Sequence, residues 1–221
     1  MRLAFEQSLN RLQDDLLFLA SLVESAIIES VDILRRRDHA DARRLMAADE
    51  RINQRRFAIE SDTLTLIATQ QPMAGDMRYL AAILEIAGEL ERIGDYAKGI
   101  ANINLMMGDK PLIKPLVDIP MMADKARNML HDAIEAFIHR DQAAAQNIPI
   151  RDDEVDALYN QVFQDLLDLI IADRKQNADQ ATYLLWVAHN LERTADRVVN
   201  ICERVVYTVT GEMIEMNGME A

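Results

Sequence analysis

Apolar residues recur three and four positions apart along most of this chain, with polar residues between them. The clearest stripe lies within residues 78–103 and consists of Leu80, Ile83, Leu84, Ala87, Leu90, Gly94, Ala97 and Ala101. This spacing places the side chains on one face of an α-helix. The stretch is therefore predicted to form a long helix with one face in the protein core.

The same periodicity predicts five further helices. They cover residues 3–36 and 40–69 before the stripe, and roughly 121–139, 141–172 and 177–209 after it. Asp38 and Asp76 are expected to cap the second and third helices, because an aspartate side chain accepts hydrogen bonds from free N–H groups at a helix start. Pro149 falls within the first turns of the fifth helix, where a kink or a late start is expected.

Residues 108–120 contain three of the five prolines. A helix cannot pass through such a segment without losing backbone hydrogen bonds, so the segment is predicted to be a linker. It separates a first unit, residues 1–107, from a second unit, residues 121–210. Residues 211–221 lose the pattern, which predicts a frayed C-terminal tail.

The second unit repeats the first at an offset of 101 to 103 positions. Matched residues include Asp38 with Asp141, Asp49 with Asp152, Glu91 with Glu192, and Asp95 with Asp196. Three amphipathic helices with short connections bury their stripes most simply as an antiparallel bundle. The prediction is an all-α fold of two tandem three-helix bundles related by a pseudo-twofold axis.

Composition and charge agree with this fold and narrow the function. The 221 residues include only seven glycines and five prolines, which favours long helices over a sheet with many turns. The formal net charge of -13 repels a phosphate backbone, so no nucleic acid is expected as a partner. The same charge suits cations or basic patches on a protein partner.

The location of the protein is predicted from its cysteine and its apolar runs. A single cysteine, Cys202, excludes an internal disulfide, fits a reducing compartment, and lies on an apolar helical face as a core residue. The longest uncharged run, residues 63–75, has 13 residues, whereas a bilayer span needs about 20. We expect a cytoplasmic protein with no direct membrane span, which partners could recruit to the inner face of the membrane.

Acidic residues four positions apart carry the candidate chemistry. Glu91 and Asp95 project from one side of their helix, and the second helix offers Asp49 with Asn53. The second unit offers Asp152 with Asp156, and Glu192 with Asp196. Oxygen ligands on adjacent helices suit Mg²⁺, Mn²⁺ or Fe³⁺, and also Zn²⁺.

A single acidic pair of this kind is more often a solvated helix face than a metal site. Recurrence at the same place in both units favours metal binding, because a solvated face has no need to keep the pair. The four histidines show no repeated ligand spacing, and the chain has no Glu-x-x-His motif of di-iron enzymes. Glycine-rich nucleotide loops and nucleophile elbows are also missing from the sequence, so an enzyme is not expected.

Several runs of residues resemble the PhoU family of phosphate-transport regulators. In the first unit these are residues 71–78, Gln-Pro-Met-Ala-Gly-Asp-Met-Arg, and residues 90–95, Leu-Glu-Arg-Ile-Gly-Asp. In the second unit they are residues 153–159, Asp-Glu-Val-Asp-Ala-Leu-Tyr, and residues 190–197, Asn-Leu-Glu-Arg-Thr-Ala-Asp-Arg. The resemblance covers nearly the whole chain, in order.

The resemblance implies two three-helix bundles whose acidic motifs hold metal clusters at the surface. The first acidic set implied by position is Asp49, Glu91 and Asp95, and the second acidic set is Asp152, Asp156, Glu192 and Asp196. Asn53 stands where the family has an acidic residue, which removes one charged ligand from the first set. Asn102 and Glu203, with Asn53, are second-tier ligand candidates. The metal could be iron, zinc, manganese or magnesium, and its identity stays open.

The resemblance also implies a regulatory role. Members of the family are negative regulators of the phosphate-starvation response that limit phosphate uptake, linking the ATPase subunit of a phosphate ABC transporter to a membrane sensor histidine kinase. We therefore expect a metal-binding cytoplasmic adaptor that forms homodimers and has no catalytic turnover. A carboxylate-bridged metalloenzyme and a purely structural helical bundle remain the alternatives. The partner-binding faces and direct phosphate binding are left open by the sequence.

Overall fold

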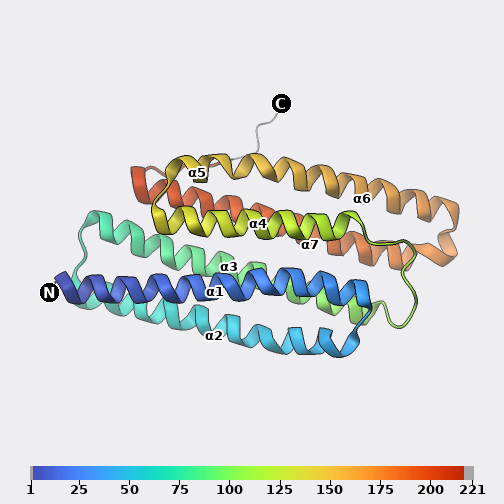
Figure 1. Ribbon diagram of the computed structural model, residues 1–221, viewed down its shortest axis with the longest axis horizontal. Coiled ribbons are helices and arrows are strands. Elements are labelled where there is room, and N and C mark those ends of the chain that lie inside the picture. The colour runs from blue at the N-terminus through green and yellow to red at the C-terminus, as the bar shows by residue number, and fades with distance from the viewer. Residues whose placement is uncertain (1, 217–221) are drawn as a thin grey trace.

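Long helices lie side by side along one axis in the computed structural model, which describes residues 2–216 (Figure 1). The first unit contains α1 (Arg2–Arg36), α2 (His39–Gln70) and α3 (Ala74–Met106). The second unit contains α4 (Asp118–His139), α5 (Gln142–Asn147), a 3₁₀ turn (Pro149–Arg151), α6 (Asp152–Ala172) and α7 (Arg174–Thr210). Residues 2–216 include no β-strand, so the predicted all-α class is confirmed.

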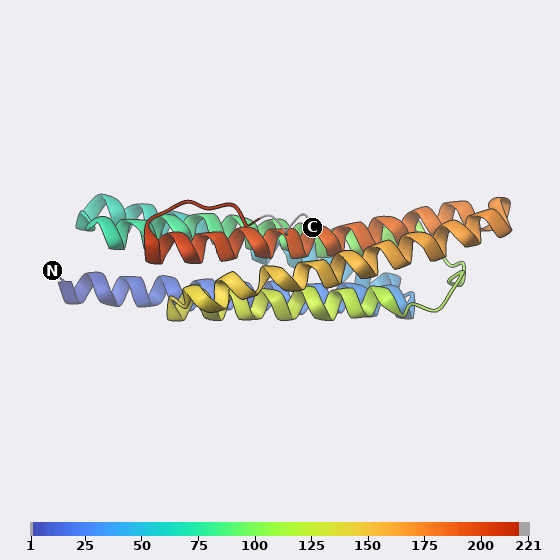
Figure 2. The ribbon, with the colours of Figure 1, turned by 90° about the horizontal axis from the view of Figure 1, so that it is seen from above.

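The two units pack along two pairs of equivalent helices. α3 lies against α7 and α1 lies against α4, while α2 and α6 flank the outside of each unit (Figures 1 and 2). In both pairs the two helices run in opposite directions, as a pseudo-twofold axis between the units requires (Figure 1). The predicted arrangement of two tandem three-helix bundles is confirmed.

One hydrophobic core runs through both units. Its buried side chains come from every long helix, and α1, α3, α4 and α7 contribute most of them. Tyr79 of α3 stacks on Phe137 of α4, with ring centroids 4.6 Å apart, so this aromatic pair joins the units directly. Cys202 is fully buried in α7, as expected of a core residue, and burial raises the pKa of its thiol to about 12.

The turn that precedes the second helix has the same conformation and the same type of cap in both units. Arg37 and Arg140 adopt left-handed backbone angles, with φ of 57° and 53°. Asp38 follows Arg37 and accepts hydrogen bonds from the N–H groups of Ala40 and Asp41, which confirms the predicted cap. Asp141 follows Arg140 and accepts one from the N–H group of Ala144.

Several predicted helix starts need correction. Asp76 does not cap α3, because the helix begins at Ala74 and Met73 takes the cap position; Asp76 lies in the first turn, where its charge faces the positive end of the helix dipole. α4 begins at Asp118, before the expected residue 121, because Pro120 falls in the first turn, where no N–H group is needed. The interruption predicted at Pro149 is confirmed, since a 3₁₀ turn starting there separates α5 from α6.

The predicted frayed tail is wrong for residues 211–216. Gly211 ends α7 with a left-handed φ of 79°, and the segment then folds back along the helix (Figure 2). The N–H group of Met216 donates to Glu203 Oε1 at 2.8 Å, and Ile214 packs against the core. Apolar contact and one charge-assisted hydrogen bond therefore anchor a segment without helical periodicity. Residues 217–221, also predicted to fray, lie outside the described residues.

Candidate metal sites

The second acidic set lies where the start of α6 faces the middle of α7. Asp152 and Asp156 come from the first two turns of α6, and Glu192 and Asp196 come from α7. Burial, followed by the negative charges of Asp156, Asp196 and Glu192, raises the pKa of Asp152 to about 7. Tertiary packing thus gathers the four carboxylates that the sequence predicted would meet.

The neighbouring carboxylates respond in the same direction. Burial, followed by the charge of Asp196, raises the pKa of both Asp156 and Glu192. His189 Nδ1 lies 3.2 Å from Glu192 Oε2, and Arg193 Nη1 lies 2.8 Å from Asp196 Oδ2. These two side chains contact the α7 carboxylates at the edge of the set.

Asp152 has an oxygen left unsatisfied. Its Oδ1 atom is buried and finds no hydrogen-bond partner among the described residues. A buried carboxylate oxygen without a donor is costly, and several carboxylates that raise one another's pKa favour a bound cation. The donor set, all oxygen and rich in charge, fits the hard divalent cations that carboxylates prefer. The residue types of the second acidic set therefore suit the predicted metal.

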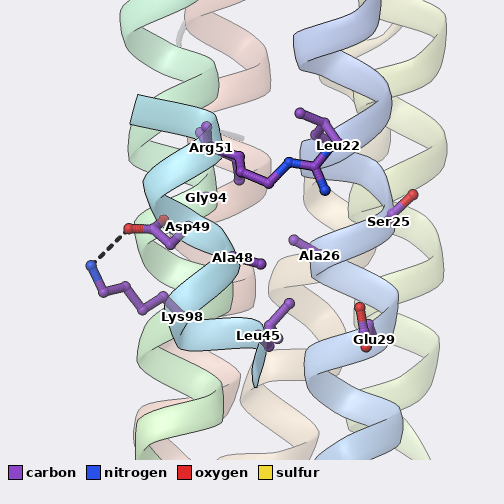
Figure 3. A pocket seen from close by; sticks show the side chains of 11 residues that line it. Leu22, Ser25, Ala26, Glu29, Leu45, Ala48, Asp49, Arg51, Gly94 and Lys98 are labelled. Carbon is purple, nitrogen blue, oxygen red and sulfur yellow. Dashed lines mark hydrogen bonds and ion pairs between the residues drawn. The ribbon is translucent and has the colours of Figure 1, made fainter. Parts of the chain in front are cut away.

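The first acidic set differs because a lysine side chain enters it. Asp49 of α2 is only 5% exposed, and its Oδ2 atom accepts hydrogen bonds from Lys98 Nζ at 2.7 Å and from Asn53 Nδ2 at 3.3 Å (Figure 3). Lys98 Nζ also lies 3.9 Å from Asp95 Oδ1. Burial raises the pKa of Glu91, and the negative charges of Asp95 and Asp49 add to the rise. The three predicted carboxylates therefore share one neighbourhood.

Lys98 is the residue that sequence reasoning missed. It stands three residues after Asp95 and seven after Glu91, so helical periodicity already placed it on the same face of α3. Gly94 allows α2 to approach this face closely, because a Cβ atom there would lie 3.0 Å from Ile52 Cδ1. A cavity of about 160 Å³ lies beside these residues, between α1, α2 and α3 (Figure 3).

The second-tier candidates are placed differently from one another. Asn53 contacts Asp49 and belongs to the first set, as described above. Asn102 is exposed and donates to Met106 Sδ at 3.7 Å, and Glu203 pairs with Arg204 and the N–H group of Met216. Each lies seven residues, about 10 Å along the helix axis, beyond the nearest predicted aspartate.

The side chains as they stand do not form a finished metal site. Within residues 2–216, no group of three or more His, Cys, Asp or Glu side chains has an arrangement that could hold a metal ion. Metal binding by the two acidic sets therefore stays a prediction, which the composition and the unsatisfied oxygen of the second set support.

Comparison with known proteins decides the family. The model of the PhoU domain matches the chain twice, over residues 16–103 and 119–205, which correspond to the two three-helix units. The chain belongs to the PhoU family. The membership predicted from the sequence is thereby confirmed. Each copy of the PhoU domain carries one of the two acidic sets.

Two PhoU homologs match this chain over nearly its whole length. It is 34% identical to a phosphate-specific transport system accessory protein PhoU homolog from Clostridium acetobutylicum, over 98% of this chain and 99% of that protein. It is 31% identical to the protein so named from Streptococcus pneumoniae serotype 4, over 98% of this chain and 100% of that protein.

Solved PhoU structures share the fold. The crystal structure of the phosphate transport system regulatory protein PhoU from Streptococcus pneumoniae superposes with a TM-score of 0.88 at 29% identity, over 96% of this chain and 100% of that one. The crystal structure of PhoU from Pseudomonas aeruginosa gives the same TM-score at 27% identity, over 94% of this chain and 100% of that one.

Proposed function

We propose that this PhoU-family chain is a regulator associated with phosphate transport, and that it acts as a cytoplasmic adaptor that limits phosphate uptake. The observation that carries the proposal is the full-length match to accessory proteins of phosphate-specific transport systems. The PhoU domain matches the chain twice, and the alignments cover 99% and 100% of those two relatives.

The partners that we propose are the ATPase subunit of a phosphate ABC transporter and a membrane sensor histidine kinase. An accessory protein of a transport system acts by contact with that system, and a formal net charge of -13 suits basic patches on a partner. Within residues 2–216, no helix combines the length and apolar character that crossing a membrane requires. We further propose that the chain forms homodimers and holds the kinase in its inactive state when phosphate is ample.

Deletion of the gene tests the regulatory role. Expression of phosphate-starvation genes at high phosphate should rise in the deletion strain and return to normal on complementation. Affinity capture from membranes at high phosphate should recover the transporter ATPase and the sensor kinase. Unchanged phosphate-responsive expression would contradict the proposal.

Metal binding is proposed chiefly for the second acidic set. Glu192→Ala with Asp196→Ala should lower the metal bound per chain more than Glu91→Ala with Asp95→Ala does, because the second set has four carboxylates and no lysine among them. The measurement is elemental analysis of protein purified without chelator. Equal losses in the two double variants, or no loss in either, would contradict this ranking.

A test for catalytic turnover distinguishes the proposed adaptor from the alternative, a metalloenzyme. An adaptor should show no activity on phosphate esters or peroxide above background. Activity that Glu192→Ala abolishes would instead identify a metalloenzyme.

A further inference from the structure

The two acidic sets differ in charge at two equivalent positions: Asn53 is matched by Asp156, and a lysine of the first unit is matched by a valine. Glu91 and Asp95 recur at an offset of 101 as Glu192 and Asp196, and at the same offset Lys98 is matched by Val199. A lysine therefore faces the first set from α3, where the equivalent position on α7 carries an uncharged side chain.

Lys98 makes the contacts that a bound cation would make. Its ammonium group lies 2.7 Å from Asp49 Oδ2 (Figure 3) and 3.9 Å from Asp95 Oδ1, so it bridges a carboxylate of α2 and a carboxylate of α3. Asp49 is 5% exposed, and attraction between opposite charges strengthens where water is excluded. The hydrogen bond to Asp49 raises the pKa of Lys98.

Among residues 2–216, no equivalent cation pairs with Asp152. Arg151, the preceding residue, pairs instead with Asp132 at 2.6 Å, and Arg193 pairs with Asp196. Asp152 Oδ1 and Asp49 Oδ1 both lack a hydrogen-bond partner among the described residues, but the other oxygen of Asp49 is paired with Lys98. The equivalent aspartates of the two units thus differ in whether the protein itself supplies a positive charge.

We infer that the ammonium group of Lys98 takes the place of a metal cation in the first acidic set. The two sets therefore differ in function. Lys98 offsets one of the three negative charges of the first set and holds α2 against α3 without a metal. The second set takes a divalent cation from solution, and this part rests on the proposed function. The chain is therefore asymmetric in metal binding despite its duplicated fold.

Exchange of the charge between the units tests the inference. Lys98→Met should tighten Mn²⁺ binding by the first set by about tenfold or more, equivalent to about 1.4 kcal/mol, and Asp49→Asn should abolish the gain. Val199→Lys should weaken Mn²⁺ binding by the second set by a similar factor. Calorimetric titration with Mn²⁺ measures both, and Lys175→Met, at an exposed position of α7, is the matched control. Lys98→Met that adds no binding, or only as much as Lys175→Met adds, would overturn the inference.

A metal-free measurement separates this inference from the proposed function. In EDTA, Lys98→Met should lower the Tm by about 3 °C or more, because it leaves Asp49 buried without its cation. Asp49→Asn in the same chain should remove much of that loss, since the two side chains are energetically coupled. Absence of coupling would overturn the role of Lys98 even if the wild type binds Mn²⁺. If Lys98 and Asp49 are coupled but the wild type binds no Mn²⁺, the role of Lys98 stands and the proposed metal function is overturned.

Discussion

Residues of the same type meet different environments in the two units. Asp49 and Asp152 occupy equivalent positions, and each has one oxygen without a hydrogen-bond partner among the described residues. The other oxygen of Asp49 bonds Lys98 and Asn53, whereas Asp152 lies among three other carboxylates. The spacing of the acids was visible in the sequence, because a helical period places them on one face. Their burial and the approach of Lys98 to Asp49 were not, because both depend on packing between different helices.

The raised pKa of Asp152 predicts a pH dependence of stability. In the metal-free protein, the folded state holds a proton up to about pH 7 that the unfolded chain releases near pH 3.8. Stability from this group is therefore fully present below about pH 4 and is lost as the pH rises through 7. Asp152→Asn should flatten this part of the pH profile and make the chain more stable than the wild type at pH 8.

Urea unfolding in EDTA between pH 4 and pH 8 measures the effect. Asp168→Asn, at an exposed position further along α6, is the control and should leave the slope unchanged. If the stability of Asp152→Asn depends on pH as strongly as that of the wild type, the pKa of the Asp152 carboxyl group is not raised.

Helices follow from the periodic pattern, whereas their ends depend on single residues. The cap at Asp38 was predictable because it stands alone between two periodic stretches. The cap at Asp76 was predicted wrongly, because α3 could begin directly after Pro72 and place Asp76 inside its first turn. Left-handed Arg37 and Arg140 were not predicted, since arginine carries no preference for that conformation.

The two turns predict a graded response to loss of the cap. Asp38→Ala should lower the Tm by about 2–4 °C, and Asp141→Ala should lower it less, because Asp38 accepts two backbone hydrogen bonds and Asp141 accepts one. Asp76→Ala, which removes a first-turn charge but no cap, is the control and should have the smallest effect. Thermal unfolding followed by circular dichroism at 222 nm measures all three variants. Equal shifts in the three would contradict this account of the helix starts.

The whole molecule joins its units through α3 and α7. Arg197 of α7 donates to Tyr96 of α3 at 3.3 Å and to Glu89 at 3.4 Å, and Arg204 pairs with Glu85 at 3.0 Å. The first acidic set lies between α2 and α3, and the second lies between α6 and α7. The two sets therefore flank one seam that polar contacts and a shared core hold together.

Removal of divalent cations should destabilise the whole molecule through the second set. Chelation by EDTA is expected to lower the Tm of the wild type, because a cation that binds only the folded state stabilises it. The variant with Glu192→Ala and Asp196→Ala should show little further change in EDTA, since its set has lost two of its four carboxylates. Scanning calorimetry with and without EDTA measures the shifts. An equal drop in the wild type and this variant would place the stabilising cation elsewhere.

The sequence by itself determined the helices, the duplication and the acidic spacing, because backbone hydrogen bonding and amphipathic periodicity act over a few neighbouring residues. It also identified the family, since the matching runs are local strings of residues. Only the tertiary structure decided the pairing of Lys98 with Asp49, 49 residues apart, the burial of Asp152, and the return of residues 211–216 onto α7. Charge environment and burial depend on which helices pack together, and no local pattern contains that information.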